Sequence, residues 1–251
     1  METTFDVIIL AGGKGTRMNS NLPKPLYEVG GIPTLRRIIV STSALSPRPI
    51  IVVNDQAEKI IQIAGKNCRF VLQKEQKGTG HAVQCVKRSL KKSDVKENLM
   101  VLPGDHPMIS TKTLNELSAS HLRSNASLTL CTLVVPDLEE DRRLFFNYGR
   151  IRRDPSGELA SIVEVKDATE KEKEIRELNV GYYCFKTTWL WKNIDALTDH
   201  NAAREFYLTD LVRVAIEQNV KTNSYALDDP SIGMGFNTPE QLEIIRKYGH
   251  K

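Results

Sequence analysis

The chain alternates short apolar runs with longer amphipathic stretches through its first half, and few folds accommodate that order. Runs rich in apolar and β-branched residues predict buried strands at Phe5–Leu10, Ile50–Val53, Arg69–Leu72, Leu99–Leu102 and Ser127–Val135. The stretches between them have helical spacing, at Thr34–Ala44, Gln56–Ala64, Thr79–Leu90 and Thr111–Arg123. This alternation predicts an α/β fold with a Rossmann-like, mostly parallel sheet and helices on both faces. Such sheets bind ligands beyond the carboxyl ends of their strands, where we expect the chemistry.

The pattern changes in the second half. Tyr148–Arg153 and Glu158–Val165 flank the turn sequence Asp154-Pro155-Ser156-Gly157 and predict a β-hairpin. The charged run Glu170–Glu177 predicts a solvated helix or loop, and further elements are expected at Leu178–Phe185 (strand), Thr187–Leu197, Thr209–Gln218 and Pro239–Tyr248 (helices). We expect one domain over residues 1–251, with a core over about 1–135, a smaller β-rich lobe over about 136–230 and a closing segment over about 231–251.

Charge, cysteines and hydropathy exclude several classes of protein. The 35 basic and 31 acidic residues are spread along the chain, which argues against a nucleic-acid-binding tail and favours small anionic ligands. The four cysteines form no C-x-x-C pair and have apolar neighbours, so we expect reduced, packed thiols in a cytoplasmic protein. No apolar run approaches the length of a membrane span, and we expect no membrane partner.

A glycine-rich loop follows the first predicted strand. It reads Leu10-Ala11-Gly12-Gly13-Lys14-Gly15-Thr16-Arg17-Met18 and precedes the segment Pro23-Lys24-Pro25-Leu26. Glycines let backbone N–H groups approach a triphosphate, while the nearby lysines and arginine add positive charge. The spacing is neither that of a P-loop nor that of a dinucleotide fingerprint. We interpret it as a phosphate-binding loop, because a glycine-rich turn with incidental basic residues leaves the Pro-Lys-Pro segment unexplained.

The loop and the Pro-Lys-Pro-Leu segment resemble the signature of nucleoside-triphosphate:sugar-1-phosphate nucleotidyltransferases. Within that family the chain is similar to the uridylyltransferase domain of bacterial bifunctional N-acetylglucosamine-1-phosphate uridylyltransferases. The similar segments span nearly the whole chain in the same order, at 73–82, 104–107, 148–151, 162–169, 177–181 and 205–210. The resemblance implies that the protein converts UTP and a sugar-1-phosphate to a UDP-sugar and pyrophosphate. It favours N-acetylglucosamine-1-phosphate as the sugar phosphate and a role in the biosynthesis of cell wall precursors.

Nucleotide contacts are expected along the loop and at the start of one helix. Gln73 ends a predicted strand, where its amide can pair with a base edge, and the resemblance assigns uracil to Gln73 and Gly78. A lone histidine such as His81 is more often structural than catalytic. The predicted nucleotide-binding residues are Leu10, Ala11, Gly12, Gly13, Gly15, Thr16, Gln73, Gly78 and Thr79, and the predicted catalytic residues are Arg17 and Lys24.

A carboxylate follows the predicted strand Leu99–Leu102 at the edge of the sheet. This carboxylate belongs to Asp105, and its hard oxygen atoms are of the kind that Mg²⁺ prefers as ligands together with phosphate oxygens. The resemblance makes Asp105 the principal metal ligand and Asn237 its partner. The alternative for Asn237 is an N-cap of the last helix, a role that Thr238 can also fill.

The sugar site is implied by the resemblance, at Gly149, Glu164, Asn179 and Thr209. A backbone N–H, a carboxylate, an amide and a hydroxyl can together bind sugar hydroxyls and an N-acetyl group. Pro25 and Pro103 depart from the uridylyltransferase pattern and leave a glucose-1-phosphate uridylyl- or thymidylyltransferase as an alternative. A second alternative is a non-catalytic nucleotide-sensing subunit of the same fold, which the presence of Arg17, Lys24 and Asp105 disfavours. The 251 residues contain no hexapeptide repeat, so we expect no acetyltransferase β-helix within them. The oligomeric state is left open.

Overall fold

A mixed α/β sheet forms the centre of the molecule. The computed structural model describes residues 4–18, 20, 22–91 and 94–249, and within them the main sheet runs in the order β11-β7-β10-β6-β1-β4-β5. Its strands are β1 (Phe5–Leu10), β4 (Ile50–Val53), β5 (Arg69–Leu72), β6 (Asn98–Pro103), β7 (Leu128–Val134), β10 (Glu177–Lys186) and β11 (Thr222–Ala226). β1 pairs in parallel with β4 and β6, β4 with β5, and β7 with β11, whereas β10 is antiparallel to β6 and β7. The predicted fold class is confirmed.

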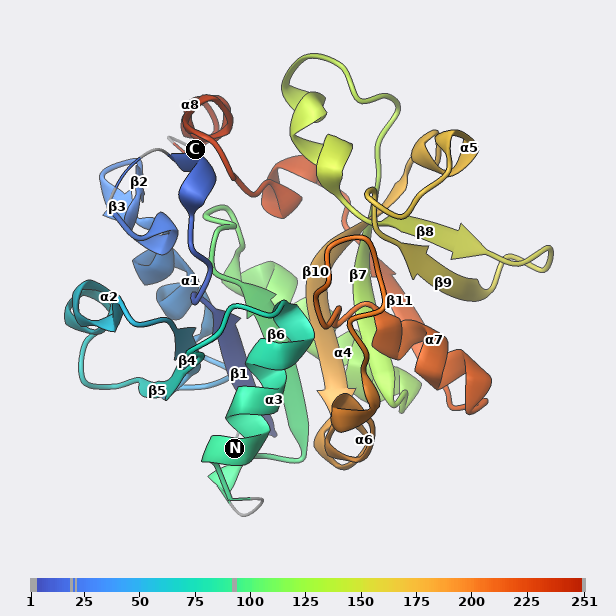
Figure 1. The fold of residues 1–251 in the computed structure, drawn as a ribbon, viewed down its shortest axis with the longest axis horizontal. Coiled ribbons are helices and arrows are strands. Elements are labelled where there is room, and N and C mark those ends of the chain that lie inside the picture. The colour runs from blue at the N-terminus through green and yellow to red at the C-terminus, as the bar shows by residue number, and fades with distance from the viewer. Residues whose placement is uncertain (1–3, 19, 21, 92–93, 250–251) are drawn as a thin grey trace.

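Helices cover both faces of this sheet (Figure 1). α1 (Thr34–Thr42), α2 (Ala57–Ala64), α4 (Thr111–Ser124) and α8 (Pro239–Arg246) pack against one face, and α3 (Thr79–Ser89), α6 (Thr187–Asn193) and α7 (Asp210–Glu217) pack against the other. Each is amphipathic, so burial of one apolar stripe per helix stabilises the layers. Each of the two apolar clusters contains side chains from both halves of the chain, for example Ile8 and Ile151 in one of them. The proposed division into core and lobe stays a prediction.

The β8–β9 hairpin leaves the main sheet beside α5 (Figure 1). β8 (Arg150–Arg153) pairs with β9 (Leu159–Val163) in the hairpin that the turn sequence between these two strands predicts. β8 also pairs with β10, through Arg150 and Leu178. The charged run forms the short helix α5 (Glu170–Lys173), whose Thr169 and Glu172 make a reciprocal capping box and which buries no residue. The expected solvated helix is therefore confirmed.

Several short elements connect the larger ones. They comprise the 3₁₀ helices η1 (Thr16–Met18), η2 (Lys24–Leu26), η4 (Glu140–Asn147), η5 (Ile194–Ala196) and η6 (Pro230–Gly233) and the strand pair β2 (Glu28–Val29) and β3 (Ile32–Pro33). η4 and β11 were not expected from the sequence. η4 buries Phe145 but leaves Phe146 about half exposed, so only the first of the two phenylalanines belongs to the core.

The four cysteines are unpaired; three are buried and Cys85 is partly exposed. This agrees with the expectation of packed thiols. No helix within the described ranges is long and apolar enough to cross a membrane.

Candidate active site

A cleft of about 580 Å³ opens at the carboxyl ends of β1 and β6. It contains every residue that the sequence assigned to the nucleotide, to catalysis or to metal. These residues are Leu10, Ala11, Gly12, Gly13, Gly15, Thr16, Arg17, Lys24, Gln73, Gly78, Thr79, Asp105 and Asn237. Residues from both ends of the chain therefore meet in one cavity. Sequence reasoning assigned no role there to Gln76 or Glu205, which also line it.

The glycine-rich loop is held at its start and open at its centre. The Ala11 N–H donates to the Val52 carbonyl at 2.9 Å, which continues the pairing of β1 with β4. Apart from the two neighbours of Gly13 in the chain, no described residue has an atom within 4 Å of where a side chain would begin there, so a ligand can approach this backbone closely. Gly15 has a φ of +61°, a conformation that glycine adopts without strain. The loop thus combines close approach with a sharp turn, as a phosphate-binding loop requires.

Gly104 brings Asp105 beside this loop. Its N–H donates to the carbonyl of Leu10 at 3.0 Å. A Cβ at residue 104 would lie 2.7 Å from that same oxygen, closer than real Cβ atoms approach. Only glycine therefore allows the end of β6 to lie against the end of β1, and the following carboxylate is placed at the mouth of the cleft.

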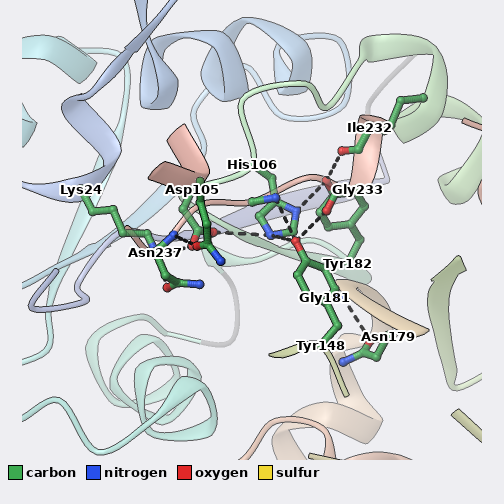
Figure 2. Close-up of polar contacts among 12 residues, drawn as sticks. Lys24, Asp105, His106, Tyr148, Asn179, Gly181, Tyr182, Ile232, Gly233 and Asn237 are labelled. Atoms are coloured by element: carbon green, nitrogen blue, oxygen red, sulfur yellow. Dashed lines mark hydrogen bonds and ion pairs between the residues drawn. The ribbon is translucent and has the colours of Figure 1, made fainter. Parts of the chain in front are cut away.

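Four polar side chains converge there, of which Figure 2 shows Lys24, Asp105 and Asn237. Lys24 forms an ion pair with Asp105 and donates from Nζ to Asn237 Oδ1 at 2.8 Å. Arg17 donates to the same Asn237 oxygen at 3.2 Å. The side chain of Thr238, not that of Asn237, caps α8 by accepting from the Gln241 N–H. The capping alternative is thus met by Thr238, and the Asn237 amide oxygen is directed at the cationic groups.

The oxygens of Asp105 and Asn237 suit a hard divalent cation. Both contact the Lys24 ammonium, so a carboxylate and an amide oxygen already converge on a shared cation. Burial opposes ionisation of Asp105, but Lys24 and the adjacent His106 hold the pKa of its carboxyl below the usual value. Among the described residues no three His, Cys, Asp or Glu side chains form a metal cage. Mg²⁺ needs only one or two protein ligands when it also binds phosphates.

The predicted base-binding residues are held by contacts around the N-terminus of α3. Gln73 is buried and donates from its amide to the Gly78 carbonyl at 3.1 Å. Its nitrogen also lies 3.2 Å from His81 Nδ1, and burial lowers the pKa of His81. Thr79 Oγ1 accepts from the Leu208 N–H at 3.1 Å. These hydrogen bonds hold the wall of the cleft in place. His81 takes part as a hydrogen-bond partner of Gln73, which agrees with a structural rather than a catalytic role for this histidine.

The four predicted sugar residues also lie together. The Asn179 N–H donates to the Gly149 carbonyl at 2.8 Å, and Thr209 Oγ1 donates to Glu164 Oε1 at 3.2 Å. A Cβ at Gly149 would lie 3.4 Å from Glu164 Oε1 and 3.6 Å from Asn179 Cβ. Burial raises the pKa of Glu164. Glu205, from the segment that leads to Thr209, lines the nucleotide cleft, so one segment joins the two groups of residues.

A glycine-rich loop and a cluster of cationic and oxygen-bearing side chains, in one cleft at the carboxyl ends of parallel strands, are typical of a nucleotide-binding transferase. The family of MobA-like NTP transferase domains matches residues 7–212. The chain belongs to this family and is a nucleotidyltransferase.

Comparison with individual relatives also supports membership of this family. The chain is 37% identical over 245 residues to the bifunctional protein GlmU of Desulfotalea psychrophila, covering 97% of this chain and 70% of that protein. It is 39% identical over 242 residues to GlmU of Streptococcus equi subsp. zooepidemicus and 37% identical over 250 residues to GlmU of Lactococcus lactis, of which it covers 51% and 53%. The chain thus spans about half the length of most of these relatives. The resemblance stated from the sequence is confirmed.

Proposed function

We propose that the protein transfers the uridylyl group of UTP to N-acetylglucosamine-1-phosphate, with Mg²⁺, and releases pyrophosphate. The observation that carries this proposal is the convergence of Arg17, Lys24, Asp105 and Asn237 at the open end of the glycine-rich loop. Two cationic groups and two oxygen ligands beside a phosphate-binding loop are what transfer between phosphates requires. The similarity to the bifunctional GlmU proteins supports the choice of sugar.

The proposed reaction is an in-line attack of a sugar-phosphate oxygen on the α-phosphorus of UTP. An O–P bond forms there while the bond from the α-phosphorus to the bridging oxygen breaks, and that oxygen leaves with pyrophosphate. The attacking phosphate is already ionised near neutral pH, since its second pKa is about 6, so no general base is needed. Catalysis then rests on alignment and on neutralisation of charge.

Each residue of the site has a role in this scheme. The N–H groups of Gly12–Gly15 and the Arg17 guanidinium bind the β- and γ-phosphates, and Lys24 neutralises charge at the α-phosphate. Asp105 and Asn237 hold Mg²⁺, which when bound supplies further positive charge to the phosphates. Gln73 and Gly78 bind the uracil edge. Glu164, Asn179, Thr209 and the N–H of Gly149 bind the sugar.

Pyrophosphate release from UTP, measured against a panel of sugar-1-phosphates, tests this proposal directly. We expect kcat/KM for N-acetylglucosamine-1-phosphate to exceed that for glucose-1-phosphate by at least roughly tenfold, the scale of one lost hydrogen bond. Replacing UTP by dTTP in the same assay tests the base. Equal or reversed sugar preference would favour the alternative, a glucose-1-phosphate uridylyl- or thymidylyltransferase, for which Pro25 and Pro103 in the wall of the cleft are the supporting observations.

A further inference from the structure

Three aromatic side chains with polar atoms meet behind Asp105 (Figure 2). His106 follows Asp105, Tyr148 precedes the predicted sugar residue Gly149, and Tyr182 lies on β10 close after Asn179. We call them the His–Tyr–Tyr cluster. His106 and Tyr182 are buried and Tyr148 is partly buried, and the ring centroids of His106 lie 5.4 Å from Tyr182 and 6.0 Å from Tyr148. The cluster thus joins the end of β6 to the β-rich lobe.

The cluster holds the backbone of one segment, residues 232–235. Tyr182 donates from its hydroxyl to the Ile232 carbonyl at 2.8 Å, and Tyr148 donates to the Gly233 carbonyl at 2.8 Å. The Tyr148 hydroxyl also accepts from the Gly235 N–H at 2.9 Å. Three backbone groups of four successive residues are therefore bound by two phenol groups. Asn237, whose amide oxygen faces Lys24 and Arg17, comes two residues after this segment.

His106 contacts both the same segment and the hydroxyl of Tyr182. The Tyr182 hydroxyl uses its proton on Ile232, so at 3.0 Å it accepts from His106 Nδ1–H, which sets the tautomer of the imidazole. A Cβ at Gly235 would overlap the His106 ring and lie 3.1 Å from the Tyr148 hydroxyl. The Phe236 N–H also reaches the carbonyl of Asp105 at 3.4 Å. Segment 232–235 and the residue that follows it therefore lie directly against Asp105 and His106, and Asp105 is the principal predicted metal ligand.

We propose that His106, Tyr148 and Tyr182 are positioning residues that set the distance between Asp105 and Asn237. They act by holding segment 232–235 against the end of β6. Because Tyr148 adjoins Gly149 and Tyr182 follows Asn179 on β10, the same cluster ties the predicted sugar site to the predicted metal ligands. This inference rests on the function proposed above. A shift of an oxygen ligand by a fraction of an ångström is enough to weaken a site that must match the size of Mg²⁺.

Replacing single hydroxyls tests the cluster without emptying the core. In Tyr148→Phe and Tyr182→Phe the rings stay, but Gly233, Gly235 or Ile232 loses its partner. We expect the Mg²⁺ concentration for half-maximal pyrophosphate release to rise roughly tenfold, the scale of one lost hydrogen bond, with much of kcat recovered at high Mg²⁺. Tyr225→Phe is the matched control, because it removes a tyrosine hydroxyl that donates to Glu116 on α4, away from this segment. It should leave the Mg²⁺ dependence unchanged.

Hydrogen–deuterium exchange supplies a readout that needs neither metal nor turnover. The Gly235 N–H is bound to Tyr148, so the peptide covering residues 232–238 should exchange faster in Tyr148→Phe than in the wild type or in Tyr225→Phe. Gly235→Ala is an independent variant that should have the same effect, because its methyl group displaces the segment from His106. Unchanged exchange in both variants would contradict the proposal.

A double substitution shows whether the cluster acts through Asn237. Tyr148→Phe should shift the Mg²⁺ dependence in the wild type but add nothing in an Asn237→Ala background, because coupled residues do not contribute additively. Equal shifts in both backgrounds would overturn the positioning role. A wild type that releases no pyrophosphate with any sugar phosphate would instead contradict the proposed function, while the exchange experiment would still test the hold on segment 232–235.

Discussion

At the scale of single residues, Lys24 lies where a cation is expected. Its ammonium group contacts both Asp105 and Asn237, and the Lys24 and Asp105 side chains are only 16% and 18% exposed. The Asp105 and Asn237 side chains thus share one positively charged partner. If these oxygens hold Mg²⁺, we expect the Lys24 ammonium to move away from at least one of them, because two cations repel each other. Lys24 is then available to bind a phosphate.

Replacement of Asp105 tests the metal assignment. Asp105→Ala should lower turnover by about a hundredfold or more, because it removes a group that stabilises developing charge. Asp105→Asn keeps the shape but not the charge and should lower it comparably. Asp55→Ala, which removes an exposed carboxylate, serves as the control and should behave as wild type in the same pyrophosphate assay. Near-normal Mg²⁺-dependent turnover in Asp105→Ala would show the metal assignment to be wrong.

Arg17 and Lys24 are expected to act on the phosphates rather than on the sugar. Arg17→Ala and Lys24→Ala should each lower kcat by a larger factor than they raise the KM for the sugar phosphate. Steady-state kinetics with each substrate varied in turn gives both constants, and Lys112→Ala, an exposed lysine on α4, is the control. A selective loss of sugar-phosphate affinity at unchanged kcat would refute this division of roles.

The sequence predicted some residues of the site better than others. The loop at 10–18 could be interpreted directly, because its glycines and basic residues are contiguous and glycine has few other reasons to recur there. Asp105 followed from its place after a strand. The His–Tyr–Tyr cluster could not be predicted, because its members lie 42 and 34 positions apart along the chain and meet only once β10 is placed.

At the scale of elements, the turn into α3 depends on a glycine for two separate reasons. Gly78 has a φ of +99°, and a Cβ there would lie 2.7 Å from the Phe206 carbonyl oxygen. Gly157, in the β8–β9 turn, also has a positive φ of +87° but has open space around it. Substitutions at these two glycines therefore allow the effect of backbone strain to be measured separately from that of steric overlap.

We expect Gly78→Ala to be the more damaging of the two substitutions. Both carry the cost of an unfavourable φ, on the order of 1 kcal/mol, but only Gly78→Ala also forces the segment of Phe206 away from α3. It should lower the melting temperature further than Gly157→Ala and raise the KM for UTP, which Gly157→Ala should not. Thermal unfolding and UTP kinetics on the two variants check this, and equal effects would mean that the close approach to Phe206 is unimportant.

Element prediction failed where the local pattern was weak. β11 was missed because Thr222–Ala226 is a polar, partly exposed edge strand without apolar alternation. β10 was recognised as a strand, but nothing local shows that it enters the sheet antiparallel between β6 and β7. Its pairing with β7 shifts register between Asn179 and Tyr183, while Tyr182 and Tyr183 pack in different apolar clusters because successive residues of a strand face opposite sides of the sheet.

At the scale of the whole molecule, one buried histidine makes stability depend on pH. His121 is 1% exposed, and burial together with the charge of Lys186 lowers its pKa from 6.5 to about 4. Its ring otherwise faces the uncharged side chains of Thr129 and Phe5. The unfolded chain therefore binds a proton more readily, so stability falls as the pH drops from 6.5 to about 4, by up to roughly 3 kcal/mol for this group.

Comparison of variants isolates this effect from that of the carboxylates. The melting temperature of His121→Gln should fall less than that of the wild type between pH 6.5 and pH 4, measured by calorimetry. His200→Gln, which changes an exposed histidine, should follow the wild type throughout. Parallel curves for all three proteins would show that His121 does not contribute.

The fold class could be predicted from local sequence pattern alone. Alternating strands and helices leave few architectures, so the parallel sheet followed from Phe5–Val135 alone. The boundary expected near residue 135 marks a change of pattern and stays a prediction; apolar side chains from both sides of it pack in the same clusters. Local pattern predicts elements, whereas packing between distant segments decides which of them share a core.

The position of β10 also determines the order in which the molecule can assemble during synthesis. β6 and β7 are joined through β10, whose last residue is Lys186, so a nascent chain that has emerged only to residue 135 has no strand to fill the space between them. Strand edges left unpaired in this way invite aggregation. At least the residues up to Lys186 must leave the ribosome before β10 can join β6 to β7, and chaperones that shield open edges would matter most over that interval.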